Sequence, residues 1–299
     1  MMKSDENNEM IQEMEVCCEA IDNRLQELFA EAGSSYATLV ESMRYSLLAG
    51  GKRVRAVLCM KFCEAAGGKP EDALDVACAI EMLHTYTLIH DDMPAMDGDD
   101  MRRGMPSNHI EYGEFTAMLA GDALQAAAFG TLAGSGLPTS SIVEMVQILA
   151  HAAGPHGICG GQYLDLSGEG WHLTIDELLE LYSMKTAALI SAAARLGVIA
   201  GSGSYEQIEA AHLYSQAIGL AFQVRDDVLD CIATEEDLGK PVGSDVLNDK
   251  STFASLLGIE ACEKLIAKET DKAIEALENQ FENTEFLTWL ARILAERKN

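Results

Sequence analysis

Acidic side chains crowd one short stretch of this chain, from Ile89 to Gly104, which reads Ile-His-Asp-Asp-Met-Pro-Ala-Met-Asp-Gly-Asp-Asp-Met-Arg-Arg-Gly. Carboxylates this close repel one another, so they need either full solvation or a hard cation such as Mg²⁺. The apolar segment before them favours the cation, although a solvated acidic loop is the alternative. A group that requires both divalent cations and guanidinium groups is a polyphosphate, and Arg102 and Arg103 supply the guanidinium groups.

A second acidic cluster, Asp226-Asp227-Val-Leu-Asp230, follows Phe222-Gln-Val-Arg near the end of an apolar segment. On a helix, Asp226 and Asp230 lie one turn apart on one face with Asp227 beside them, so three carboxylates point to one place. A solvated face is again the alternative, but such a cluster is penalised in an apolar helix unless something neutralises it. Two clusters about 130 residues apart suggest opposed walls that hold several Mg²⁺ ions around a diphosphate.

Helices must position both clusters. The residues from Glu71 to Ile89 form a predicted apolar helix that delivers Asp91 and Asp92 at its end, and Tyr205 to Ile232 form the helix of the second cluster. Further helices are predicted over Met10–Ala32, Tyr36–Leu48, Lys52–Ala66, Gly113–Leu132, Ser140–Gly154, His156–Leu166 and Thr174–Gly201, with amphipathic helix after an irregular loop from Asp237 to Lys250. Because no alternating run and no linker is found, the sequence predicts one all-α domain over residues 1–299.

Composition narrows the class of protein. Hydrophobic residues make up 48% of the 299 residues and only six are prolines, which favours a helical globular protein with a sizeable core. The net charge of −27 argues against nucleic acid or an anionic membrane surface as a partner. Eight cysteines without a C-x-x-C pair and a polar N-terminus without a signal predict a cytoplasmic protein with reduced thiols. The apolar stretches are interrupted by Asp122 and Arg195, so no membrane span is expected.

Shorter motifs accompany the two acidic clusters. In chain order they are Gly50-Gly51-Lys52-Arg53-Val54-Arg55, Gly160-Gly161-Gln162, Lys185-Thr186, Lys240 and Lys250-Ser251-Thr252. Together with Asp91-Asp92-Met-Pro-Ala-Met-Asp97, Arg102-Arg103-Gly104 and the second cluster, they resemble the trans-prenyl diphosphate synthase family over nearly the whole chain, and most closely its bacterial farnesyl diphosphate synthases. The resemblance implies the isoprenoid synthase fold, a bundle of about ten or more helices around a central active-site cavity, and a homodimer.

The resemblance also implies a role for each motif. Three Mg²⁺ ions, or Mn²⁺ as the alternative, would bind with the allylic diphosphate to Asp91, Asp92, Asp97, Asp226, Asp227 and Asp230. The allylic diphosphate would be contacted directly by Arg102, Lys185 and Lys240, with Lys250 in the same segment. Isopentenyl diphosphate would be held by Gly51, Lys52, Arg55, His84 and Arg103. The catalytic residues would be Arg102, Lys185, Thr186 and Gln223, the last two and the Lys185 carbonyl steadying an allylic carbocation, while departing diphosphate takes the proton.

Some of these residues have ordinary interpretations when taken singly. Lys52 and Arg55 could be ordinary solvated charges, and His84 could be a helix histidine whose hydrogen bonds are made within the protein. The glycine pair before Lys52 favours the functional interpretation, because a helix N-terminus with free N–H groups beside basic side chains suits a diphosphate. The final Arg297-Lys298-Asn299 and the loop before Lys250 are expected to close over the site and keep water out.

Tyr86 and Thr87 precede the first cluster by one turn, and Tyr86 lies on the side that would floor a product tunnel. Core packing of a tyrosine is the alternative. In similar enzymes an aromatic residue here stops growth at C15, so we expect farnesyl diphosphate, made from isopentenyl diphosphate with dimethylallyl and then geranyl diphosphate. A geranylgeranyl diphosphate synthase remains an alternative. A terpene cyclase is more remote, because it would carry an Asn/Ser/Glu metal motif in place of the second Asp cluster and would not need Lys52 and Arg55. A non-catalytic subunit of a heteromeric synthase is also remote, because such a subunit is expected to have lost an Asp cluster and both are present.

Overall fold

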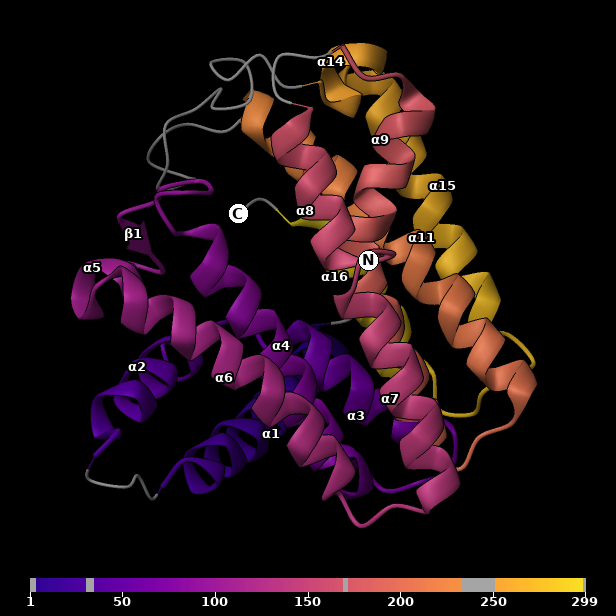
Figure 1. The fold of residues 1–299 in the computed structure, drawn as a ribbon. Helices are drawn as coiled ribbons and strands as arrows, with labels where there is room; N and C mark the ends of the chain where they lie inside the picture. The colour runs from indigo at the N-terminus through magenta and orange to yellow at the C-terminus, as the bar shows by residue number, and fades with distance from the viewer. Residues whose placement is uncertain (1–3, 31–34, 169–171, 233–250, 298–299) are drawn as a thin grey trace. The chain divides into compact units, whose positions relative to one another are not determined.

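The computed structural model describes residues 4–30, 35–168, 172–232 and 251–297. Helices dominate the described residues, which confirms the predicted all-α class (Figure 1). Contacts between Cα atoms group the chain into two compact units, each described here by itself. Unit 1 comprises Met1–Ile148 and Leu196–Gly203, and unit 2 comprises Leu149–Arg195 and Ser204–Asn299. The single domain remains a prediction.

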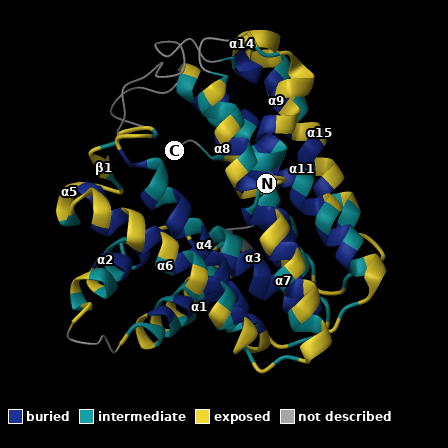
Figure 2. Cartoon of the chain, viewed as in Figure 1, coloured by how far each residue is buried: buried dark blue, intermediate teal, exposed yellow. Residues whose placement is uncertain are grey.

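Unit 1 is built on α4 (Leu74–Asp91), which packs lengthwise against α6 (Glu114–Ala133). The sequence of α4 is apolar around its whole circumference, and such a helix is stable only when it is buried. Figure 2 accordingly shows α4 and α3 largely in the dark blue of buried residues. The remaining elements of this unit are α1 (Ser4–Leu28), α2 (Ala37–Leu47), α3 (Val54–Ala65), η1 (Pro70–Ala73), β1 (Met101–Arg102), β2 (Met105–Pro106), α5 (Asn108–Tyr112) and most of α7 (Thr139–Ala153).

Unit 2 is built on α11 (Tyr205–Ile232), which packs along α15 (Ile259–Leu277). Its core includes Tyr182, Val224, Val228 and Phe253, all buried. The other elements are α8 (Ile158–Ser167), α9 (Ile175–Tyr182), η2 (Ser183–Ala187), α10 (Ala188–Ala200, which ends in unit 1), α14 (Phe253–Leu257) and α16 (Glu285–Glu296). Residues 233–250, which include the whole predicted polar loop from Asp237 to Lys250, lie outside the described residues.

Three local features differ from the predictions. The predicted helix from Thr174 to Gly201 begins at the expected capping box but is interrupted by η2, a π-helical turn. The predicted helix from Glu71 begins instead as a 3₁₀ turn at Pro70. The strands β1 and β2 were not predicted, because strands of two residues are too short to show alternation.

Ile175–Ala200 is the one stretch among the described residues that could cross a membrane by length and composition, with a mean hydropathy of 1.2. Our expectation of no span rested in part on Arg195, but one charge leaves the average hydropathy of an apolar window high, so the absence of a span remains a prediction. In this structure 72% of the window is buried inside the protein, as in the core helix of a globular protein.

Candidate active site

The first Asp cluster lies where α4 ends and the chain folds back. The last residue of α4 is Asp91, and the backbone N–H of Asp97 donates to the Asp91 carbonyl at 2.9 Å. Gly98 follows with φ of +69°, a left-handed conformation that glycine adopts without strain. This turn returns Asp97 to the end of α4. The backbones of Asp91 and Asp97, two predicted metal ligands, are therefore in direct contact.

A two-stranded hairpin presents Arg102 and Arg103. The turn residues Arg103 and Gly104 both have positive φ, +53° and +76°, as in a tight type I′ turn. Arg102 Nε donates to both carboxylate oxygens of Asp92 at 2.7 Å. The guanidinium of Arg103 instead donates to the Gly50 carbonyl. The two adjacent arginines therefore bind different parts of unit 1: Arg102 binds the end of α4, and Arg103 binds the loop before α3.

Asp92, a predicted metal ligand, is bound to Arg102 in this structure. Asp92 is 2% exposed, and a buried carboxylate needs a counterion close by. Burial lowers the pKa of Arg102, but the hydrogen bond and the charge of Asp92 outweigh burial and raise it above its ordinary value. Asp92 thus stabilises the charged form of Arg102 and fixes its orientation.

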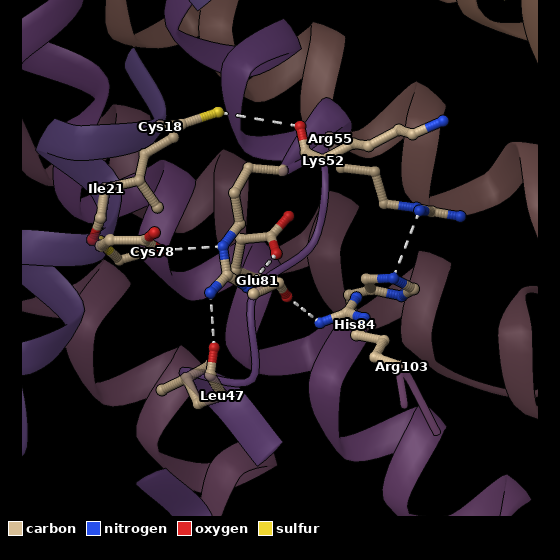
Figure 3. Close-up of polar contacts among 12 residues, drawn as sticks. Cys18, Ile21, Leu47, Lys52, Arg55, Cys78, Glu81, His84 and Arg103 are labelled. Atoms are coloured by element: carbon tan, nitrogen blue, oxygen red, sulfur yellow. Dashed lines mark hydrogen bonds and ion pairs between the residues drawn. The ribbon is translucent and has the colours of Figure 1, made fainter. Parts of the chain in front are cut away.

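The predicted isopentenyl diphosphate residues lie together at the start of α3 (Figure 3). Figure 3 shows Lys52 and Arg55 pointing to the same side, with His84 and Arg103 near Arg55. Arg55 Nη1 lies 3.5 Å from His84 Nε2, and Arg55 Nε is buried without a hydrogen-bond partner. A Cβ atom on Gly51 would lie 2.8 Å from Cζ of Arg103 and would displace its guanidinium, and the φ of +127° at Gly51 also favours glycine. The structure thus assembles all five predicted residues in unit 1.

His84 is neutral within this cationic group. Burial, followed by the charges of Arg55 and Arg103, lowers the pKa of His84 well below its ordinary value. A neutral imidazole can still donate one hydrogen bond to an anion without adding repulsion between cations. An unpartnered guanidinium N–H and a neutral imidazole beside several cations make an arrangement suited to an anionic head group.

The two predicted chain-length residues are buried on α4. The Tyr86 ring packs edge-to-face against His90, with 5.7 Å between ring centroids. Thr87 Oγ1 donates to the His84 carbonyl at 2.7 Å, which uses its hydroxyl within the helix. Of the two residues, only Tyr86 has a large side chain, so Tyr86 is the one whose substitution can test the prediction on chain length.

In unit 2 the π-helical turn η2 carries Lys185 and Thr186. Lys185 Nζ lies 2.5 Å from Asp165 Oδ2, and Thr186 Oγ1 donates to Gln223 Oε1 at 2.9 Å. Single π-helical turns occur frequently at functional sites. A cavity of about 380 Å³ is lined by residues that include Asp165, Lys185, Gln223, Asp226, Asp227, Ser251 and Thr252. The structure thus brings Lys185 and Gln223 to one cavity with two of the second-cluster aspartates, and Thr186 is joined to them through its hydrogen bond to Gln223.

The adjacent Asp226 and Asp227 have different surroundings. Asp227 is buried and accepts hydrogen bonds from the Tyr182 hydroxyl at 3.0 Å and from the Phe253 N–H at 2.8 Å. These contacts tie α11 to α9 and α14 and use both oxygens of Asp227. Asp226 instead pairs with the guanidinium of Arg297, which also lies 3.7 Å above the Phe222 ring.

Sequence reasoning missed three partners of the predicted residues. Asp165 faces Lys185, Tyr182 holds Asp227, and Glu81 lies among the arginines of unit 1. The only sequence signals were spacings: Asp165 lies one turn after Gln162 in α8, and Glu81 one turn before His84 in α4. Lys240 and Lys250 lie outside the described residues.

The donor chemistry of both acidic clusters fits a hard divalent cation. Carboxylate oxygens are the ligands that Mg²⁺ prefers, and both clusters supply them. In the part of the chain that the structure describes, no three His, Cys, Asp or Glu side chains are gathered as a ready metal site. A guanidinium lies against Asp92 and another against Asp226, so each of these carboxylates accepts a cationic partner.

Comparisons with known proteins all identify prenyl diphosphate synthases as similar to this chain. A family model described as polyprenyl synthetase matches residues 36–293. The chain is 46% identical over 246 residues to the heterodimeric geranylgeranyl pyrophosphate synthase large subunit 1 of Arabidopsis thaliana, covering 79% of this chain and 66% of that protein. It is 41% identical over 264 residues to the farnesyl diphosphate synthase of Geobacillus stearothermophilus, covering 87% of this chain and 89% of that protein.

Solved structures support the fold. The geranylgeranyl pyrophosphate synthetase from Pyrococcus horikoshii has a TM-score of 0.88 at 33% identity, covering 97% of this chain and 99% of that chain. An FPP/GFPP synthase from Zymomonas mobilis has a TM-score of 0.86 at 34% identity, covering 96% of this chain and 99% of that one. Likeness at this level over nearly full length confirms the predicted isoprenoid synthase fold.

Proposed function

We propose that this chain, which belongs to the polyprenyl synthetase family, is a prenyltransferase that joins isopentenyl diphosphate to an allylic diphosphate. The observation that carries the proposal is the cationic group of Arg55 and Arg103 beside His84, with Lys52 pointing to the same side as Arg55. In a protein with a net charge of −27, a local group of this kind is the feature that an anionic substrate requires. The names of the relatives, geranylgeranyl and farnesyl diphosphate synthases, support the same reaction class.

The product proposed is farnesyl diphosphate, formed from dimethylallyl and then geranyl diphosphate. The buried Tyr86 near the end of α4 supports this choice, as does the likeness to the Geobacillus enzyme. Geranylgeranyl diphosphate is a second candidate of comparable weight, because several relatives carry that name, including the Cyanophora paradoxa enzyme at 46% identity over 248 residues.

In the proposed reaction the protein binds two diphosphates and stabilises the charge that develops between them. Mg²⁺ bound by the aspartates of each cluster would supply positive charge that stabilises the departing diphosphate. Arg102 and Lys185 would contact this leaving group, and the linked Thr186 and Gln223 would direct dipoles toward the allylic cation. The departing diphosphate would take the final proton, since a strong base beside a carbocation would itself be alkylated.

One assay tests the proposal. The purified protein is incubated with isopentenyl diphosphate and each allylic diphosphate, with and without Mg²⁺, and the prenyl alcohols are identified after phosphatase treatment. We expect Mg²⁺-dependent condensation with dimethylallyl and geranyl diphosphate, and loss of product in EDTA. Absence of product with every pair would refute the enzyme proposal, while C20 alcohol as the main product would favour the second candidate.

Gly161 sets the position of Lys185, and an alanine there is expected to lower activity strongly. A Cβ atom on Gly161 would lie 2.3 Å from the Lys185 nitrogen and 2.6 Å from its Cα, so α8 and η2 would have to separate. Displacement of a catalytic group by about 1 Å can cost about 100-fold in rate, and Gly161→Ala should lower kcat/KM by about that factor. Steady-state kinetics with geranyl diphosphate checks this. Gly130→Ala is the matched control, because its Cβ would enter open space on a helix, and equal kinetics for the two variants would refute the argument.

A homodimer is also proposed, with α5 and α6 at its interface. Phe115, Met118 and Leu119 lie on one face of α6 and are exposed, Phe115 at 78%, and Ile110 of α5 is exposed beside them in sequence. Exposed apolar side chains gathered on one face mark an interaction surface. The Arabidopsis relative is named as a subunit of a heterodimer, which supports pairing in this family. A second copy of this chain is the occupant we propose.

Leu119→Glu is expected to convert the dimer to a monomer, because the interface would then bury two unpaired carboxylates, one from each copy. Light scattering after size-exclusion chromatography measures the change in mass. Val16→Glu is the control, since Val16 is exposed at 66% on α1, away from this face in sequence. A wild-type monomer, or a Leu119→Glu variant that stays dimeric, would contradict the proposal.

A cytoplasmic location is proposed from the cysteines. Cys59, Cys63 and Cys78 are buried, and burial raises the pKa of Cys63 and of Cys78 to about 12. Thiols of this kind stay protonated and unreactive in a reducing compartment. Fractionation of cells that express the protein, followed by immunoblotting, tests the location.

A further inference from the structure

Arg53 belongs to the loop of the isopentenyl diphosphate residues, but its side chain is buried among different partners. The side chain is 1% exposed. Its Nε donates to Asp22 Oδ1 at 2.9 Å, and its Nη1 donates to Glu81 Oε2 at 3.0 Å. Its Nη2 donates to the Leu47 carbonyl at 2.6 Å. All three guanidinium nitrogens therefore donate to protein acceptors, and Arg53 is held by the protein itself.

These contacts tie one loop to three helices. Leu47 ends α2, Asp22 belongs to α1 and Glu81 belongs to α4. Glu81 lies one turn before His84 on α4, and Figure 3 shows both side chains near the loop that starts α3. Arg53 thus sets the loop against the helix that carries His84.

The backbone of this loop needs an anchor. Gly50, Gly51 and Arg53 have φ of +81°, +127° and +47°. A left-handed conformation is easy for glycine but strained for arginine, and such a residue persists only when its surroundings hold it in place. The three hydrogen bonds of the Arg53 side chain supply that restraint, and Lys52 and Arg55 flank it on either side.

Glu81 also balances the charge of this group. Its side chain is 2% exposed and lies among arginines. Burial lowers the pKa of Arg55 and of Arg103, and the charge of Glu81 opposes the shift in both. The buried Glu81 carboxylate therefore accepts a hydrogen bond from Arg53 and stabilises the positive charges of Arg55 and Arg103 electrostatically.

We propose that Arg53 and Glu81 are positioning residues for isopentenyl diphosphate. The buried pair touches no substrate and holds the loop so that Lys52 and Arg55 meet the diphosphate together with His84 and Arg103. This inference rests on the proposed function and deepens it, because it assigns the specificity for one of the two substrates to an ion pair behind the site.

Arg53→Lys tests the proposal, since lysine keeps the charge but lacks the planar fork that reaches three acceptors. We expect the KM for isopentenyl diphosphate to rise by about tenfold, while the KM for geranyl diphosphate stays within about twofold and kcat within about threefold. Calorimetry with isopentenyl diphosphate in the absence of Mg²⁺ should show the same loss of affinity, and this readout does not depend on condensation.

Two variants separate positioning from stability. Arg24→Lys is the matched control, because Arg24 also joins α1 to α4, through Asp75 at 2.7 Å, but is 33% exposed, and its partners Asp75 and Glu27 are not loop residues. Its kinetics should equal wild type. The double variant Arg53→Leu with Glu81→Leu removes both buried charges, a change that folded proteins often tolerate. It should melt within a few degrees of wild type and still show the defect specific to isopentenyl diphosphate.

These measurements distinguish failure of the positioning role from failure of the proposed condensation reaction. Equal losses for both substrates, or unchanged binding of isopentenyl diphosphate by Arg53→Lys, would overturn the positioning role. So would a wild-type protein that does not bind isopentenyl diphosphate. Binding by wild type without condensation would refute the proposed reaction alone, and the calorimetric comparison would still decide the role of Arg53.

Discussion

Asp226→Asn is expected to lower kcat for condensation by about 100- to 1000-fold, the cost typical of removing one preorganised electrostatic contact. Asparagine has the shape of aspartate but no charge, so it would weaken the hold of α11 on the proposed divalent cation. The variant should also need more Mg²⁺ for half-maximal rate. Initial rates measured across a Mg²⁺ titration check both statements.

The structure offers a control for this result. Asp271 is an exposed aspartate of α15, and Asp271→Asn changes the net charge by the same amount. It should leave rate and Mg²⁺ dependence unchanged. If Asp226→Asn keeps its rate within about threefold of wild type, Asp226 serves only as the partner of Arg297, and its assignment as a metal ligand is wrong.

Tyr86→Ala is expected to change the main product from C15 to C20. The Tyr86 ring is buried on α4 against His90, so its loss opens a cavity that its neighbours fill only in part. If this ring stops the growing chain, that space admits another five-carbon unit. Reverse-phase chromatography of the dephosphorylated products measures the ratio of C15 to C20 alcohols.

Tyr86→Phe is the control for the ring, because it removes only the hydroxyl and should keep the C15 product. An unchanged product from Tyr86→Ala would remove Tyr86 from the account of chain length. A wild-type protein that already makes mainly C20 would have the same consequence, since the ring would then not limit growth.

Periodicity was enough to predict most helices of this protein. The predicted bounds of α11, Tyr205 to Ile232, coincide with those observed, because a long run of helix formers carries its own pattern. The capping box of Thr174 and Glu177 likewise begins α9 as predicted. The π-helical turn within the following helix could not be predicted, because its residues fit an ordinary helical pattern.

The site was predictable in its residue types but not in its pairings. Sequence alone directs Asp226 and Asp227 to the same place, yet one pairs with Arg297 and the other is buried under Tyr182. The contact of Arg53 with Glu81 joins residues 28 positions apart, and no local pattern indicates it. Such differences arise from packing between helices, which sets burial and partners only after the chain has folded.

The tight turn of Arg103 and Gly104 limits how this region can evolve. A two-residue type I′ turn fixes the register of its strands, and a shift of one residue reverses the face of every side chain. An inserted residue would take Arg102 away from Asp92 and leave a buried carboxylate without its counterion. The hairpin can therefore tolerate changes of residue type in its strands, but its length is constrained by a charge that lies on a different element.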